Sequence, residues 1–429
     1  MDAQGTSGQP VTVLHNVRVF DSRAGRLGGP GHVVVEGELI TAVGDGAPPE
    51  PGPADRSIDC GGRVLLPGLI DAHWHASLAT VPLPVVLRAD PGYLLIVAGQ
   101  AAGQTLRRGF TTVRDTGGPS FPIKRAVDEG VITGPRIFPS GAMISQTSGH
   151  GDFRALSELP RGRLGRLSHG ELIGAAAIAD GPAEVLRAAR EQLMQGASQL
   201  KLMAGGGVSS SHDPLDGTQF TEPELRAAVD AAADWGTYVM VHAYTPRSVQ
   251  RAIRAGVRCI EHGQLLDDET VALMAEQQVW WSLQPFLDDE DAVPVPVSSQ
   301  DKQQQVLAGT DTAYRLGRRH GVRIAWGSDT LFSAELADRQ GAQLAKLERW
   351  YTPAEVLTMA TATNAELLAL SGPRNPYPAG SLGVVEPGGY ADLLVVDGNP
   401  LEDLSLIADP ETSFAMIMKN GTMIKNRLA

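Results

Sequence analysis

Two histidines separated by one residue give the first chemical signal in this sequence. His73 and His75 follow an apolar run over residues 64–70 that is too short for a typical helix and is broken by Pro67-Gly68. Such a run predicts a buried strand. Alternate side chains of a strand share a face, so both imidazoles point the same way while Trp74 points oppositely. The pair could form half of a metal site, although two surface histidines would show the same spacing.

More polar residues of this kind stand at the ends of other apolar segments: Lys201, His242, His262 and Asp329. Each alone could be a satisfied core residue. Together they are hard to explain as packing, because burying unpaired polar groups is costly. Four imidazoles and a carboxylate suit a divalent metal such as zinc, with manganese or iron as alternatives.

Lys201 looks out of place in a metal site, because an ammonium group has only donors. Its neighbours in Gln199-Leu-Lys-Leu-Met are mostly apolar, and a desolvated lysine loses its proton readily. The free amine can react with carbon dioxide to give a carbamate, which acts as a carboxylate and can bridge two metal ions. The alternative is a lysine that reaches solvent or pairs with a nearby acid.

The elements that would position these residues alternate between strands and helices. Helical patterns such as residues 222–235, opened by Thr221-Glu-Pro-Glu224, separate the strands. Eight strands alternating with helices predict an α/β fold of the (β/α)8 TIM-like barrel type, with active-site residues at the carboxyl ends of the strands. The predicted strands are residues 64–71, 111–115, 136–140, 199–203, 238–242, 259–262, 279–283 and 323–329.

The barrel is expected to span residues 64–371. Short strand patterns precede it in residues 1–63 and follow it in residues 372–429, and we expect both ends to form one small composite β-sandwich domain. Two long loops, residues 141–181 and 285–300, follow barrel strands and are predicted to cover a substrate. Apolar candidates for the rim are Leu78, Val81, Leu83, Val85 and Phe153, which could equally be core or oligomer contacts.

Composition excludes several other classes of protein. The 429 residues carry a formal net charge of −13, which argues against a nucleic-acid partner. Two distant cysteines, Cys60 and Cys259, exclude a disulfide scaffold. No run is long enough to span a membrane, and residues 1–10 lack the apolar stretch of a signal peptide. We expect a cytoplasmic protein, although a processed exported form would look the same.

The motif Asp71-x-His73-x-His75, with Lys201, His242, His262 and Asp329 in that order, resembles the amidohydrolase superfamily. Thr112-Val-Arg-Asp-Thr-Gly-Gly118 and Gly388-Gly-Tyr-Ala-Asp-Leu-Leu-Val extend the resemblance along the chain. It implies a binuclear centre with two divalent ions, zinc before others, and an N6-carboxylysine at Lys201 that bridges them. His73 and His75 would hold the more buried ion, His242 and His262 the more exposed one, and Asp329 would bind the buried ion.

Three further motifs narrow the resemblance: Thr147-Ser-Gly-His150-Gly-Asp152, Lys201-Leu-Met-Ala-Gly-Gly-Gly207 and His242-Ala-Tyr244. They are similar to the Xaa-Pro dipeptidase and imidazolonepropionase-like group. This implies that His150 contacts the scissile carbonyl and that Tyr244 contacts the α-carboxylate of the substrate. The implied substrate is a dipeptide or an N-acyl-L-amino acid, with ochratoxin A, cleaved to ochratoxin alpha and L-phenylalanine, as one example.

In this interpretation Asp329 accepts a proton from water and passes it to the leaving amine. A mononuclear deaminase or imidazolone-ring hydrolase on the same fold is an alternative, but those branches lack the lysine. An inactive paralogue that acts as a scaffold or binding protein is a second alternative, and the intact ligand set counts against it. The expected partner is a small-molecule substrate, and the resemblance implies a homo-oligomer, an octamer in relatives.

Overall fold

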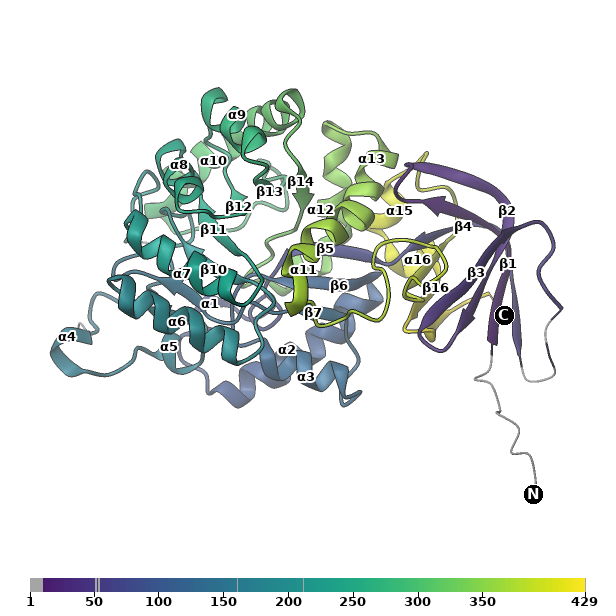
Figure 1. The fold of residues 1–429 in the computed structure, drawn as a ribbon, viewed down its shortest axis with the longest axis horizontal. Helices are drawn as coiled ribbons and strands as arrows, with labels where there is room; N and C mark the ends of the chain where they lie inside the picture. The colour runs from purple at the N-terminus through teal and green to yellow at the C-terminus, as the bar shows by residue number, and fades with distance from the viewer. Residues whose placement is uncertain (1–10, 51, 53–54, 160, 211, 429) are drawn as a thin grey trace, which may run out of the picture.

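The computed structural model describes residues 11–50, 52, 55–159, 161–210 and 212–428. Figure 1 shows two parts: a barrel surrounded by helices and, at one side, a β-sheet domain in which purple N-terminal strands lie beside the yellow C-terminal segment. The predicted architecture, a TIM-like barrel with a domain composed from both ends of the chain, is confirmed.

Eight parallel strands form the barrel, and each overlaps one of the predicted ranges. The first three pair with one another, and the last five pair in sequence order. The amide of Ser198 donates to the Pro139 carbonyl at 2.7 Å, which joins the two groups. A parallel bridge between Trp74 and Thr330 joins the first strand to the last. The strands are β5 (Leu69–Trp74), β6 (Phe110–Asp115), β7 (Arg136–Phe138), β10 (Leu200–Met203), β11 (Val239–Ala243), β12 (Cys259–His262), β13 (Trp280–Leu283) and β14 (Ile324–Trp326).

Helices cover the outside of the barrel. Several begin where the sequence predicts, and Thr221 with Glu224 forms the expected capping box. The larger helices are α2 (Pro91–Arg107), α3 (Phe121–Asp128), α6 (Pro182–Met194), α7 (Glu222–Asp234), α8 (Pro246–Arg254), α9 (Asp268–Glu276) and α10 (Val297–His320). After the last strand come α11 (Ala334–Asp338), α12 (Gln340–Ala345), α13 (Pro353–Thr358) and α14 (Asn364–Leu368). Between and after them lie a 3-10 helix (Lys346–Arg349), a π-helix (Met359–Thr363) and a second 3-10 helix (Ala369–Arg374).

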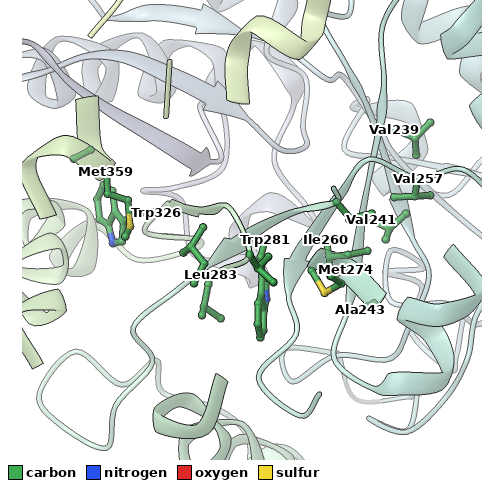
Figure 2. Packing of buried hydrophobic residues seen from close by; sticks show 14 of the residues in the cluster. Val239, Val241, Ala243, Val257, Ile260, Met274, Trp281, Leu283, Trp326 and Met359 are labelled. Atoms are coloured by element: carbon green, nitrogen blue, oxygen red, sulfur yellow. The ribbon is translucent and has the colours of Figure 1, made fainter. Parts of the chain in front are cut away.

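The strand β11 shows how alternation positions the site. Val239, Val241 and Ala243 belong to the core between the barrel and its helices, where Figure 2 shows them with Val257 and Met274. The residues between them therefore point into the barrel, and the last of these is a histidine. Apolar packing on one face thus fixes the direction of the metal-binding candidate on the other.

The long loop after β7 is partly structured. It contains β8 (Met143–Ser145), β9 (Ala176–Ile178) and the short helices α4 (Arg161–Leu164) and α5 (His169–Leu172). β8 lies between β10 and β9 at the edge of the sheet. Another short helix, α1 (Leu83–Val86), follows the first barrel strand. Among the described helices, none is long and apolar enough to cross a membrane.

The second domain is one seven-stranded mixed sheet. Its order is β17-β16-β15-β4-β1-β2-β3, in which only β1 and β4 are parallel. Two short helices, α15 (Ser405–Ala408) and α16 (Pro410–Ser413), connect β15 to β16. The strands are β1 (Val11–Asp21), β2 (Arg26–Glu36), β3 (Leu39–Asp45), β4 (Arg56–Pro67), β15 (Leu393–Val396), β16 (Phe414–Lys419) and β17 (Thr422–Asn426).

The prediction of one strand over residues 64–71 is wrong. Val64 to Pro67 end β4 and pair with β15 in the outer sheet, whereas Leu69 begins the first barrel strand. Gly68 lies between the two strands. Only glycine fits there, because a Cβ would lie 2.1 Å from the Thr111 hydroxyl oxygen. The chain therefore enters the barrel at residue 69, and residues 64–67 belong to the sheet domain.

Candidate metal centre and active site

The side chains that the sequence predicts as metal ligands meet at the carboxyl end of the barrel. His73 and His75 come from the end of β5, and Asp329 follows β14. Lys201, His242 and His262 come from the three strands β10, β11 and β12. All six line one cavity, together with His150 and Tyr244.

Asp329 is the point on which three of the histidines converge. Its Oδ1 lies 3.0 Å from Nε2 of His73 and 3.4 Å from Nε2 of His75. Its Oδ2 lies 3.8 Å from Nδ1 of His262. Ligand atoms of His73, His262 and Asp329 all fall within 4.8 Å of one another, a spacing that suits a metal centre.

Each of the four histidines has one ring nitrogen bound to an oxygen acceptor. Because these acceptors have no hydrogen to give, the bound nitrogen carries the proton and the other nitrogen keeps its lone pair. This arrangement orients metal-binding histidines in known sites. The pairs are His73 Nδ1 with Glu261 at 2.6 Å, His75 Nδ1 with the Gly117 carbonyl at 2.9 Å, His242 Nε2 with the Gly206 carbonyl at 3.1 Å, and His262 Nδ1 with Gln284 Oε1 at 2.8 Å.

The residues present therefore fit a cation. The lone pairs of His73 and His75 face the same carboxylate oxygen of Asp329. All three atoms are hydrogen-bond acceptors, so a cation between them would satisfy them. Burial opposes charge on His73, but Asp329 and Glu261 raise its pKa, so the local field favours a positive charge there. Burial lowers the pKa of His262 to about 3 and that of His242 well below its usual value, which keeps both imidazoles neutral.

Lys201 is 2% exposed at the centre of the ligand set. Burial lowers the pKa of its amine. No salt bridge to Lys201 forms among the residues that the structure describes, so the alternative of a lysine paired with an acid finds no partner there. Burial outweighs the nearby Glu261 and Asp329, which raise the pKa of Lys201, and so favours the neutral amine. This is the form that can react with carbon dioxide.

A buried ion pair beneath the site was not anticipated from the sequence. Arg114, on β6, donates from Nη2 to both carboxylate oxygens of Glu261 at 2.8 Å, and from Nε to the Ala72 carbonyl at 2.5 Å. Burial alone would raise the pKa of Glu261, but Arg114 and His73 hold it well below its usual range. The available signal was a charged residue within each of two apolar strands.

Asp71 connects the first and last strands. It accepts hydrogen bonds from the His73 amide at 2.9 Å, from the Ser328 hydroxyl at 2.7 Å and from Gln340 at 2.8 Å. Asp329 and His262 both have positive φ, 52° and 74°. Such conformations cost about 1–3 kcal/mol each and cluster at functional sites.

His150 and Tyr244 are buried and contact the rings of the histidine cluster. The His150 ring stacks on His242 with 4.2 Å between centroids. Tyr244 contacts His242 edge-on at 5.2 Å and stacks on His262 at 5.1 Å. Burial raises the pKa of Tyr244 well above its usual value, so its hydroxyl stays a donor at neutral pH.

Apolar side chains form most of the remaining cavity wall. The segment 285–296, which we call the lid segment, lies in the second predicted covering loop and contributes several of them. Phe153 also lines the cavity, as expected for a rim residue, whereas Leu78 and Val81 are buried core and Leu83 and Val85 lie outside the wall. The apolar lining includes Met143, Met203, Val208, Phe286, Leu287, Val293, Val295, Val306, Leu331 and Phe332.

This fold, with polar residues from five strands meeting at the mouth of the barrel, defines a hydrolase-type site. The chain belongs to the amidohydrolase family, whose model matches residues 64–425. It is accordingly an enzyme that hydrolyses carbon–nitrogen bonds.

Three relatives show the range of this similarity. Ochratoxinase of Aspergillus niger is 33% identical over 388 residues, which cover 84% of this chain and 76% of that protein. The crystal structure of a prolidase complexed with N-methylphosphonate-L-proline is 36% identical with a TM-score of 0.88, covering 97% of this chain and all of the other. The structure of a Xaa-Pro dipeptidase with bound methionine is 28% identical, with a TM-score of 0.83 and coverage of 96% and 99%.

Proposed function

We propose that this chain is a binuclear metal-dependent amidohydrolase that releases the C-terminal amino acid from an N-acyl-L-amino acid or a dipeptide. The observation that carries the proposal is the set of four histidines, each with one nitrogen fixed by an acceptor, which line one cavity together with Lys201 and Asp329. The similarity to ochratoxinase and to prolidases supports the amide bond as the target.

His73 and His75 would hold one ion and His242 and His262 the other, with Lys201 and Asp329 completing the set. Divalent ions bound there would polarise the scissile carbonyl and lower the pKa of the attacking water. The neutral Lys201 amine forms an N–C bond to carbon dioxide and releases one proton. The product is a carbamate anion, which is a suitable metal ligand.

The chain's own residues supply the proton transfers and the binding. Asp329 is ionised, because His73 and His262 outweigh burial and lower its pKa well below the usual range. It accepts a proton from the attacking water and delivers it to the leaving nitrogen. His150 donates a hydrogen bond to the carbonyl oxygen as negative charge develops there. The Tyr244 hydroxyl donates to the α-carboxylate of the substrate.

The apolar walls favour a substrate with apolar or aromatic groups on at least one side of the amide. Ochratoxin A, with an aromatic acyl group and L-phenylalanine, satisfies this on both sides. We therefore place it first among substrates to test, followed by N-aroyl amino acids and dipeptides that end in Pro, Phe, Lys or Arg.

The test is mass spectrometry of this panel, with lactones and aminopurines added, after incubation with protein reconstituted with zinc and bicarbonate. Release of a free amino acid is the expected result. Loss of ammonia would instead favour the deaminase alternative, which has its own relative, a 5-methylthioadenosine/S-adenosylhomocysteine deaminase of Symbiobacterium thermophilum at 25% identity. No turnover by fully metallated protein would contradict the proposal and favour the scaffold alternative.

A further inference from the structure

One loop after β10 contacts two of the histidines in the site. We call the residues Gly206, Gly207, Ser209, Ser210 and Asp213 the His150 cradle. The carbonyl of Gly206 accepts the hydrogen bond from His242. Ser210 Oγ lies 3.1 Å and Asp213 Oδ2 lies 3.4 Å from Nδ1 of His150, and Ser209 Oγ lies 3.5 Å from its Nε2.

The cradle is shaped around the His150 ring. A Cβ on Gly207 would lie 2.1 Å from Cε1 of His150, so the ring packs directly on the loop backbone. Asp213 is held in place by the Gly207 amide at 2.9 Å and by Gln219 at 3.2 Å. Oε1 of the same Gln219 accepts a hydrogen bond from the backbone amide of His150 at 2.9 Å. The position of His150 therefore depends on the conformation of this loop.

Lys302, on α10, fixes that conformation from outside the loop. Its ammonium group donates to the backbone carbonyls of Gly207 at 2.9 Å, Ser210 at 2.6 Å and Asp213 at 3.2 Å. An ammonium group has three N–H donors, so Lys302 uses all of them to bind three carbonyls of the cradle. Charge-assisted bonds of this kind are stronger than bonds between neutral groups.

The next residue on α10, Gln303, connects the same helix to the lid segment. Gln303 lines the cavity and donates to the carbonyl of Val293, in the lid segment, at 2.6 Å. Two consecutive residues near the start of α10 thus contact both the lid segment and the His150 cradle.

We propose that Lys302 is a positioning residue that places His150 for the chemical step by clamping the His150 cradle. The role of His150 in that step rests on the proposed function. The lysine itself acts only through the loop. Removing it should therefore lower kcat, while the apolar wall residues outside this loop stay in place.

The first experiment compares Lys302→Met with the matched control Lys425→Met. Lys425 also donates to backbone carbonyls, those of Pro410 at 3.0 Å and Glu411 at 2.5 Å, but it lies in the sheet domain. We expect Lys302→Met to lower kcat by about 10–100-fold, as for other residues that orient a site, with KM changed by less than about 3-fold. Lys425→Met should match the unmodified enzyme, and Lys302→Arg, which keeps donors and charge, should recover part of the loss.

A double variant tests whether the effect passes through His150. In a His150→Ala background, Lys302→Met should cause no further loss of kcat, because residues that act as a unit are not additive. Multiplicative losses would overturn the proposal, as would a kcat within about twofold of the unmodified enzyme for Lys302→Met. If Lys302→Met fails to fold, Lys302→Gln takes its place in the same measurements.

A second readout does not depend on activity. Hydrogen–deuterium exchange at the Gly207 amide, which is bound to Asp213, should accelerate in Lys302→Met and not in Lys425→Met. Unchanged exchange would contradict the clamp. If the unmodified enzyme releases no amino acid from any substrate, the proposed function fails, and the exchange experiment still decides whether Lys302 holds the loop.

Discussion

The histidines of the candidate metal centre differ in which nitrogen the protein holds. His73, His75 and His262 are held through Nδ1, whereas His242 is held through Nε2. The nitrogens left for bound ions are therefore Nε2 of three rings and Nδ1 of the fourth. His242, the ring held through the other nitrogen, is also the one on which His150 stacks. Its orientation therefore affects both the candidate metal centre and the residue proposed to contact the scissile carbonyl.

At this scale the sharpest prediction concerns Asp329. Asp329→Asn keeps the size of the side chain and removes its basicity, so kcat should fall by about 10²–10⁴-fold. Native mass spectrometry of the intact variant protein should show that the metal ions are retained. A turnover number equal to that of the unmodified enzyme, with both ions present, would contradict the assigned proton transfer.

The candidate ligands could be located from the sequence because each lies within or just after an apolar strand. Their supports could not. Glu261 and Arg114 are charged residues inside apolar segments, and nothing in the sequence indicates that they pair with each other. Lys302 and Asp213 act through backbone carbonyls and amides, which leave no spacing pattern. Such contacts are visible only once the fold brings distant backbone groups together.

At the scale of elements, ion pairs to Arg339 and Lys346 hold the lid segment, and Asp291 is the most buried carboxylate among them. The Asp291 side chain is 2% exposed and pairs with Arg339 and, at 2.7 Å, with Lys346. Its neighbour Glu290 also pairs with Arg339, but its side chain is 74% exposed. Exposed pairs contribute little, whereas buried charged hydrogen bonds contribute more.

We expect Asp291→Asn to raise KM by about tenfold or more, because a lost charged bond of about 1.5–3 kcal/mol loosens the wall that the lid segment forms. The matched variant Glu290→Gln should stay within about twofold of the unmodified enzyme. Steady-state kinetics on the best substrate of the panel would show this. Equal effects of the two substitutions would refute the role of Asp291.

The strand β16 carries a second testable group, Lys419. Burial lowers the pKa of this lysine from 10.5 to about 8, with Arg136 acting in the same direction and Asp392 opposing both. Between these two values the unfolded chain binds more protons than the folded one, so stability gained from this group rises with pH across that window.

Lys419→Met should therefore be more stable than the unmodified protein near pH 7. The advantage should shrink as the pH rises from about 8 towards 10.5, because the native lysine loses its proton there. Urea unfolding at several pH values measures the difference. An advantage that grows with pH would have the wrong sign for this explanation.

Elements were predictable where their pattern is local. Strand and helix periods identify the barrel, and the capping box of Thr221 with Glu224 marks the start of α7. The division of residues 64–71 into two strands at Gly68 depends on a distant part of the chain. Val64 to Pro67 join the outer sheet because their partner is Leu393–Val396, near the other end of the chain.

At the scale of the whole molecule, ligands from strands around the barrel would share the same ions. Metal binding should then stabilise the entire barrel by about 4 kcal/mol at a thousandfold excess over Kd. Removal of the ions with a chelator should lower the Tm by several degrees, and zinc with bicarbonate should restore it. Calorimetry with verified metal content is the measurement. An identical Tm with and without metal would show that the ions do not bridge the fold.

The pairing of β4 with β15 also has a consequence for biosynthesis. During translation β4 emerges early, but its antiparallel partner lies close to the C-terminal end of the chain. At about 5–20 residues per second, the edge of β4 waits for tens of seconds before that partner exists. An open strand edge invites pairing with other chains. Ribosomes stalled before residue 393 should therefore hold nascent chains that depend on chaperones, whereas chains released with β15 in place should not.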